Sequence, residues 1–291
     1  MKIAVIGLLG KWSSEQLVEE IRALGHESKV IEMENVVFDL QSRKVTYMGE
    51  DLDSYDGFII KKLGKEYSSY LYDRLEVLDF LEKVKKKKFF PTPDKVRRLI
   101  NRYSCTKELC MGNIPLPPTT VTENVNDAVK KLESYGEAIV KPLFTSKSKG
   151  MIKLKDDETS ILRLENFKRE FNTIYLQKVV KHPGYDLGVC FLGEDYIGTY
   201  ARVGNKDGWN TTTRHGGHYE KKEPSQEIID LARKARNIFD LVFTCVDVVE
   251  TPEGPKVFEV SAFGGFKGLK ESAGMNLAKM YAEYVVNSLK A

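Results

Sequence analysis

Apolar runs alternate with amphipathic stretches along this chain, which indicates a protein that mixes strands with helices. The first part predicts strands at 2–6, 28–33 and 56–61, with a hairpin-like stretch at 36–48. Helices are expected at 15–24, capped by Ser13 or Ser14 and ended by Gly25, and at 67–88. The second helix has one apolar face, made by Leu71, Leu75, Leu78, Leu81 and Val84. This part is therefore expected to fold as a small α/β lobe.

Prolines mark the transition to two further lobes. Pro91-Thr-Pro93 and Pro115-Leu-Pro-Pro118 flank two short helical stretches, the second of which contains Lys107. Beyond them the pattern is that of two α+β lobes with antiparallel strands. In order, it predicts a helix at 126–135, strands at 137–141 and 151–155, a helix at 160–171, strands at 173–180, 186–191 and 196–203, and helices at 226–241 and 276–289. We divide the chain into residues 1–95, 96–180 and 181–291.

A hairpin near the C-terminus carries the clearest chemical signal. Residues 242–250 and 256–261 are rich in Val and Phe and flank Thr251-Pro-Glu-Gly-Pro255, a turn sequence. A turn centred on Glu253 places Asp247 opposite Glu259, with Cβ atoms about 5 Å apart. Two facing carboxylates repel unless a cation lies between them, and oxygen ligands suit Mg²⁺. Ser261 points to the same face as Glu259 and is a possible third ligand; in a different register both acids would simply be solvated.

Composition narrows the class of protein. The 291 residues are 42% hydrophobic and 30% charged, with a net charge of +3 that gives no argument for nucleic-acid binding. No stretch reaches the roughly 18 apolar residues of a membrane span. The four cysteines are scattered without metal-binding spacing, so reduced thiols in a cytoplasm are expected. Gly7-Leu-Leu-Gly10 lacks the full glycine fingerprint of a dinucleotide site. We also expect a homo-oligomer.

Lysines near the lobe junctions suggest a phosphate-bearing ligand. Lys141 ends an apolar strand directly before the Ser/Lys/Gly-rich loop 144–150, so its ammonium can meet phosphate oxygens; Lys107 is a second candidate. The strand Tyr175-Leu-Gln-Lys-Val-Val180 could offer backbone groups to adenine, with Val180 as an apolar floor. Each of these signals also fits an ordinary surface lysine or a buried strand.

Taken in order, these motifs resemble the ATP-grasp superfamily and, within it, the ribosomal-protein-S6-modification type of glutamate ligase. The resemblance covers nearly the whole chain. Its residues are Leu52 to Gly64, Lys107, Ile139-Val-Lys-Pro142, Leu176 to Val180, Asp186, Ala201-Arg202, His215-Gly-Gly217, Val246-Asp247 and Glu259-Val-Ser261. It implies an ATP-grasp fold with an N-terminal pre-ATP-grasp α/β lobe and two α+β lobes that enclose ATP.

The resemblance also implies roles for single residues. Lys107 and Lys141 would bind phosphates, Lys178 and Val180 would contact adenine through their backbone, and Asp186 would lie at ribose. Gln177 would be a further ATP-binding residue. Asp247, Glu259 and Ser261 would hold two Mg²⁺ ions, or Mn²⁺, and Arg202 would act at the reacting carboxylate. Three positions depart from the family pattern. Lys178 stands where the family often has Glu, Gly188 where it has an arginine, and Ser261 where it has a metal-binding Asn.

The segments 200–210 and 259–266 look most like the archaeal branch that glutamylates coenzymes. L-Glutamate would then be joined to a carboxylate-bearing coenzyme of the tetrahydromethanopterin type through an acyl phosphate. A deazaflavin coenzyme or a peptide is the alternative acceptor. Lys206, Asn210 and Arg214 are candidate acceptor ligands, although solvated loop charges would look the same. A nucleotide-binding regulatory protein that has lost ligation is the alternative from another class.

Overall fold

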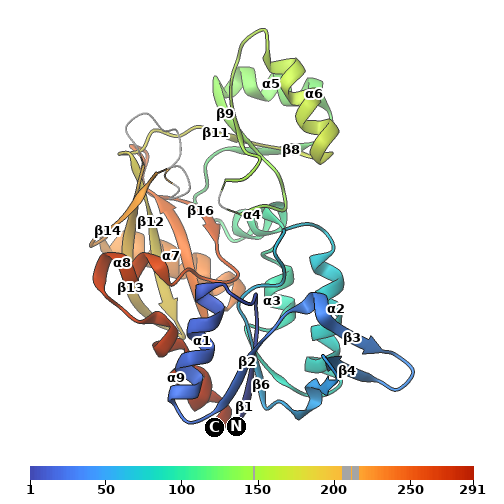
Figure 1. The fold of residues 1–291 in the computed structure, drawn as a ribbon. Coiled ribbons are helices and arrows are strands. Elements are labelled where there is room, and N and C mark those ends of the chain that lie inside the picture. The colour runs from blue at the N-terminus through green and yellow to red at the C-terminus, as the bar shows by residue number, and fades with distance from the viewer. Residues whose placement is uncertain (147, 205–210, 212–215) are drawn as a thin grey trace.

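The computed structural model of the chain describes residues 1–146, 148–204, 211 and 216–291. Its elements form an N-terminal lobe, a central lobe and a C-terminal lobe, and the central lobe stands apart from the other two (Figure 1). Each of the three lobes is built on one larger sheet.

The N-terminal lobe has a parallel sheet in the order β2-β1-β6-β7. Its strands are β1 (Lys2–Ile6), β2 (Glu27–Ile31), β6 (Gly57–Ile60) and β7 (Lys88–Phe90), with helices α1 (Trp12–Ala23) and α2 (Leu71–Lys83). A small antiparallel sheet, β3 (Val36–Asp39), β4 (Lys44–Tyr47) and β5 (Glu50–Asp51), follows the 3-10 turn η1 (Met33–Asn35) and precedes η2 (Leu52–Ser54). The expected α/β lobe and hairpin are present.

Two expectations about this lobe were wrong in detail. Helix α1 begins at Trp12 with Lys11 as N-cap, because the Ser14 hydroxyl accepts from the Leu8 N–H instead of capping the helix. A Cβ at Gly7 would lie 2.6 Å from the Ser14 hydroxyl oxygen, so Gly7 permits the close approach of β1 and α1. The expected long helix at 67–88 is shorter, since residues 88–90 join the sheet as strand β7.

Glu50 ties the small sheet to the parallel one, and this contact gives a stability prediction. Lys2 and Lys29 both donate to its carboxylate, which lowers the pKa of Glu50 from 4.5 to about 2. A lowered folded-state pKa stabilises the fold above about pH 4.5, and this contribution is lost as the pH falls toward 2. Glu50→Gln should therefore reduce the free energy of unfolding by about 1 kcal/mol at pH 7, allowing for partial exposure.

Chemical denaturation of both proteins from pH 2 to pH 7 measures this difference. The gap between wild type and Glu50→Gln should close as the pH falls below 4.5. Glu165→Gln is the matched control, because Glu165 is an exposed acid on the central lobe without an ion pair among the described residues. A gap that persists unchanged at pH 2 would contradict the ionic origin of the effect.

The central lobe has an antiparallel sheet in the order β10-β9-β11-β8, covered by two helices. Its elements are β8 (Thr119–Thr122), α5 (Val125–Tyr135), β9 (Glu137–Lys141), β10 (Ile152–Lys155), α6 (Ser160–Phe171) and β11 (Ile174–Lys178). Asn124 caps α5 by accepting from the N–H groups of Asn126 and Asp127. The lobe has a hydrophobic core of its own, which includes Leu132, Val140, Leu164 and Leu176.

The C-terminal lobe has a five-stranded antiparallel sheet in the order β14-β13-β12-β15-β16. Its elements are β12 (Tyr185–Leu192), β13 (Asp195–Val203), β14 (His218–Lys221), α7 (Gln226–Phe239), β15 (Phe243–Val249), β16 (Lys256–Val260), α8 (Lys267–Ala273) and α9 (Leu277–Lys290). No described helix is both long enough and apolar enough to cross a membrane.

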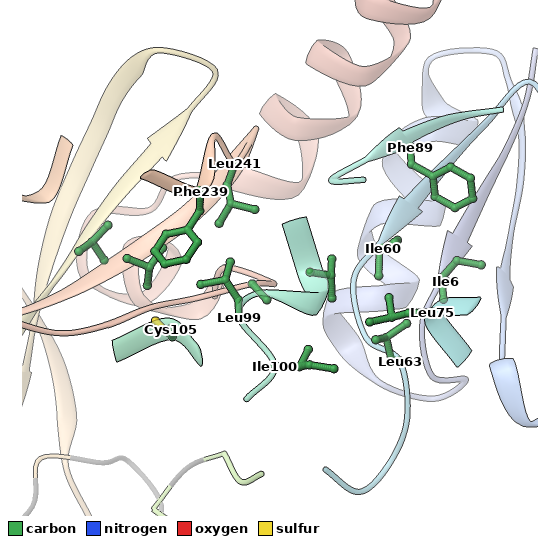
Figure 2. Packing of buried hydrophobic residues seen from close by; sticks show 14 of the residues in the cluster. Ile6, Ile60, Leu63, Leu75, Phe89, Leu99, Ile100, Cys105, Phe239 and Leu241 are labelled. Carbon is green, nitrogen blue, oxygen red and sulfur yellow. The ribbon is translucent and has the colours of Figure 1, made fainter. Parts of the chain in front are cut away.

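The N-terminal and C-terminal lobes share their hydrophobic cores. Figure 2 shows Leu99 between Phe239 and Leu241 of the C-terminal lobe and Leu63 and Leu75 of the N-terminal lobe. Helices α3 (Pro93–Arg97) and α4 (Arg102–Met111) lie at this junction, and α4 contacts β16 and α7. The last helix, α9, packs against α1, which brings the two termini together (Figure 1).

A buried lysine also joins these two lobes. Lys61, directly after β6, donates from Nζ to the carbonyl oxygens of Phe263, at 2.6 Å, and Gly264. Its ammonium lies 3.6 Å from the centroid of the Phe266 ring. The N-terminal lobe thereby fixes the backbone that follows Ser261, at the edge of the cavity described next.

Candidate active site

A cavity of about 470 Å³ lies between the central and C-terminal lobes. Its volume is in the range of small-molecule sites, typically about 300–1,000 Å³. Nine of the sequence-predicted site residues line it: Lys141, Gln177, Lys178, Val180, Asp186, Arg202, Asp247, Glu259 and Ser261. The structure therefore brings together residues that are far apart in the sequence.

The paired carboxylates lie opposite each other, as the hairpin pattern predicts. Asp247 on β15 is the register partner of Glu259 on β16. The register then shifts by one residue, so that Phe258 is extra on β16 and Val248 pairs with Val257. Such a bulge bends the strand and redirects side chains, and bulges are common beside active sites. Phe258 lines the cavity, and its ring centroid lies 5.4 Å from Nζ of Lys141.

Each of these carboxylates has one oxygen engaged and one available. Oδ2 of Asp247 is 2.8 Å from Nη2 of Arg202, and Oε2 of Glu259 is 2.9 Å from Nη1 of Arg102. Oδ1 of Asp247, Oε1 of Glu259 and the Ser261 hydroxyl have no protein partner among the described residues. Burial raises the pKa of Asp247 to about 7, with Arg202 opposing the shift.

This donor set fits Mg²⁺ that is also bound to phosphate. Mg²⁺ typically takes one or two carboxylates and completes its shell with water and substrate phosphates. No group of three or more His, Cys, Asp or Glu residues suited to a metal occurs within the described ranges. Asp247, Glu259 and Ser261 would thus hold the ion only together with a phosphate-bearing ligand.

Arg202 connects two acidic residues of the C-terminal lobe, Asp186 and Asp247. Its Nε and Nη2 both donate to Oδ2 of Asp186, with Nε at 2.9 Å, while Nη2 also contacts Asp247. Thr211 donates to the other oxygen of Asp186, which is only 4% exposed. The two acids raise the pKa of Arg202, and burial opposes them. The carboxylate predicted to meet ribose is thus held by Arg202 and Thr211.

Position 188, where the resemblance implies an arginine, has room only for glycine in this structure. Gly188 pairs with Asp247 on one side and with Tyr200 on the other. Any Cβ at this position would collide with the Tyr200 ring, which also covers Gly268. Tyr200, which lines the cavity, therefore occupies the space that a side chain at position 188 would need.

Lys141, at the end of β9, is held in the cavity by a side chain of the neighbouring strand β11. Its Nζ donates to Oε1 of Gln177 at 2.5 Å, and Nε2 of Gln177 donates to the Thr119 hydroxyl at 3.0 Å. Burial lowers the pKa of Lys141 to about 7; Arg102 adds to this shift, while Glu259 and Asp247 oppose it. An anion in the cavity would favour the charged form, which suits a phosphate ligand.

The chain after β11 offers one backbone donor for adenine. The N–H groups of Lys178 and Val179 donate to the carbonyls of Pro118 and Glu137. The Val180 N–H has no such partner among the described residues. Gln177, also predicted to bind ATP, lines the cavity, and its side chain accepts a hydrogen bond from Lys141.

Lys107 does not lie with the other predicted residues. It is exposed on α4 and lines neither described cavity, whereas Arg102, in the first turn of the same helix, lines both. Sequence reasoning missed Arg102, although a cation at a helix N-terminus opposes the helix dipole and so hints at another purpose. Asn101 caps α4 and fixes this turn. Tyr200, Tyr219 and Thr211 are further lining residues that were missed.

The candidate acceptor ligands Lys206, Asn210 and Arg214 lie outside the described residues. The four cysteines are free thiols, and Cys245 lines the cavity with its Sγ 2.9 Å from that of Cys190.

Comparison with known families decides the identity of the fold. The model of the RimK-like ATP-grasp domain matches residues 100–285, and that of the RimK PreATP-grasp domain matches residues 1–85. The chain belongs to the RimK-like ATP-grasp family. This confirms the predicted fold class, and because the family consists of ADP-forming ligases, the protein is a ligase. ATP-grasp ligases use ATP with Mg²⁺.

Several known proteins are similar to this chain over its whole length. The tetrahydromethanopterin:alpha-L-glutamate ligase of Methanocaldococcus jannaschii is 28% identical, covering 100% of both chains. A probable alpha-L-glutamate ligase of Psychromonas ingrahamii is 24% identical, covering 100% of this chain and 97% of that one. The solved ATP-grasp ligase PsnB, complexed with a phosphomimetic variant of its minimal precursor, Mg and ADP, has a TM-score of 0.76 at 17% identity, covering 99% and 98% of the two chains.

Proposed function

We propose that this protein joins the amine of L-glutamate to a carboxylate of a tetrahydromethanopterin-type coenzyme. The observation that carries the proposal is the set of Asp247, Glu259, Lys141 and Arg202 around one cavity, in a chain that resembles named glutamate ligases over its full length. Free cysteines agree with a cytoplasmic location. A homo-oligomer stays a prediction.

The reaction has two steps. A carboxylate oxygen of the coenzyme attacks the γ-phosphorus of ATP, the bond to the β-phosphate oxygen breaks, and ADP leaves. The glutamate nitrogen then attacks the acyl carbon, the bond to the phosphate oxygen breaks, and phosphate leaves with the electron pair while the nitrogen loses a proton to phosphate or water. An acyl phosphate is needed because an oxide ion is a poor leaving group at neutral pH.

The residues mainly position groups and balance charge. Lys141 and Arg102 lie where they can meet phosphate oxygens, and Val180 N–H can donate to adenine. Arg202 can stabilise negative charge at the reacting carboxylate. Asp247, Glu259 and Ser261 would hold two Mg²⁺ ions, or Mn²⁺, which draw charge from the β- and γ-phosphates when bound.

The test is coupled-assay measurement of ADP with Mg²⁺, ATP and L-glutamate, with three acceptors compared. A pterin coenzyme, a deazaflavin coenzyme and a peptide with a free carboxylate are the three arms. We expect ADP release that needs both L-glutamate and the pterin, together with a product heavier by one glutamyl residue. Activity confined to either other acceptor would overturn the proposed substrate.

A further inference from the structure

A second, smaller cavity of about 100 Å³ adjoins the large one. Its walls come from Tyr67 of the N-terminal lobe, from the segment around α4, from the loop after β9, and from the end of β16 with the residues after it. Five residues line both cavities: Arg102, Ser146, Phe258, Glu259 and Ser261. The two cavities therefore meet at the proposed metal ligands, where the γ-phosphate of ATP would lie.

Three hydrogen-bond donors around the small cavity lack protein partners among the described residues. The Thr145 hydroxyl is buried and unpartnered. Arg102, whose side chain is 9% exposed, uses Nε and Nη1 for Pro142 and Glu259, which leaves Nη2. The Tyr67 hydroxyl is also unpartnered there, and removal from water with Glu259 nearby raises its pKa, so it remains a donor. Buried polar groups in folded proteins nearly always have a partner. The buried Thr145 hydroxyl, beside these donors of Arg102 and Tyr67, therefore indicates a polar ligand.

The rest of the wall is mixed: Thr106, Ser146, Glu259 and Ser261 are polar, and most of the remaining lining residues are apolar. Leu99, Ile100, Leu143 and Phe263 line it, and Figure 2 shows Leu99, Ile100 and Cys105 at this junction of the N- and C-terminal lobes. A cationic group with two hydroxyl donors suits a carboxylate, and the apolar part of the wall, with Leu99, Ile100, Leu143 and Phe263, suits a short aliphatic chain. The ligand is thus small, anionic and partly aliphatic.

We propose that the small cavity binds the amino-acid substrate, with its α-carboxylate at Arg102, Thr145 and Tyr67. The amine of an α-amino acid is one carbon away from that carboxylate, so it would face the shared wall and the acyl phosphate in the large cavity. Three parts of the chain supply the three donors, so the amino acid would be held only where the lobes meet. This inference rests on the proposed function and adds to it the place where the amine enters.

Thr145→Val and Tyr67→Phe test the proposal, since each removes one hydroxyl and little volume. Each should raise the KM for L-glutamate about tenfold, the effect of losing one hydrogen bond to a charged group. The KM for ATP should stay within about twofold of wild type. Thr145→Ser keeps the hydroxyl and should restore the glutamate KM. Tyr103→Phe, an exposed tyrosine on α4, is the matched control.

Binding of L-glutamate to the protein with Mg²⁺ and a non-hydrolysable ATP analogue, measured by calorimetry, gives a readout independent of turnover. Weaker binding in Thr145→Val but not in Thr145→Ser supports the site. An unchanged glutamate affinity in both Thr145→Val and Tyr67→Phe overturns it, while the proposed function still stands if wild type releases ADP with glutamate. Wild type that never responds to glutamate overturns the proposed function instead.

Discussion

Asp247→Asn and Glu259→Gln are each expected to lower kcat by about a thousandfold or more. Each variant removes the negative charge of one carboxylate and leaves the volume of the side chain nearly unchanged. Each of these carboxylates has one oxygen without a protein partner among the described residues. Loss of several kcal/mol of charge stabilisation around the transferred phosphoryl group corresponds to a loss of this size. ADP release measured across a range of Mg²⁺ concentrations gives the result.

Glu253→Gln is the matched control, because Glu253 lies exposed in the turn of the same hairpin and lines neither described cavity. It should keep the activity of wild type. Melting temperatures should stay close to wild type in all three variants. Near-normal turnover of Asp247→Asn or Glu259→Gln at low Mg²⁺ would show that the pair does not hold the metal.

Arg202→Ala should lose both activity and stability. Its guanidinium holds Asp186, which is 4% exposed, and also contacts Asp247. Removing it leaves a buried carboxylate without its cation, which costs about 3 kcal/mol of unfolding free energy. We also expect kcat to fall by about a hundredfold or more, because charge at the reacting carboxylate is no longer stabilised. Denaturant titration and ADP release measure the two effects.

A double variant separates the two roles of Arg202. In Asp186→Asn with Arg202→Met the buried charge is removed together with its partner, so stability should recover while kcat stays low. Arg169→Ala, at an exposed arginine on α6, is the control for arginine loss at a solvated position. Recovery of kcat together with stability in the double variant would show that Arg202 only maintains the fold.

Much of the site could be read from the sequence because it depends on local pattern. The turn residues around Glu253 set the hairpin, and the period of two along a strand puts Asp247 opposite Glu259. The apolar run before Lys141 likewise places this lysine at the end of a buried strand, beside the loop that lines the cavity. Full-length order of the motifs was enough to predict the ATP-grasp fold class, which family comparison confirms.

The position of side chains around the helix axis explains why Lys107, and not Arg102, was predicted as the phosphate ligand on α4. Arg102 and Lys107 are five residues apart, so their side chains point about 140° apart around the helix axis. Sequence alone does not say which face meets β16, because both faces carry polar residues. The contact of α4 with β16 decides it and turns Arg102 toward Glu259.

The sequence by itself determined the lobes' elements, the carboxylate pair and the lysine at the strand end, since each follows from short-range periodicity and turn chemistry. Only the tertiary structure decided that Tyr200 fills the space beside Gly188, that α9 packs on α1, and that Tyr67, Arg102 and Thr145 meet at one small cavity. These arrangements depend on how separate lobes pack against each other. That packing is set by the fit of whole surfaces, and no local stretch of sequence specifies it.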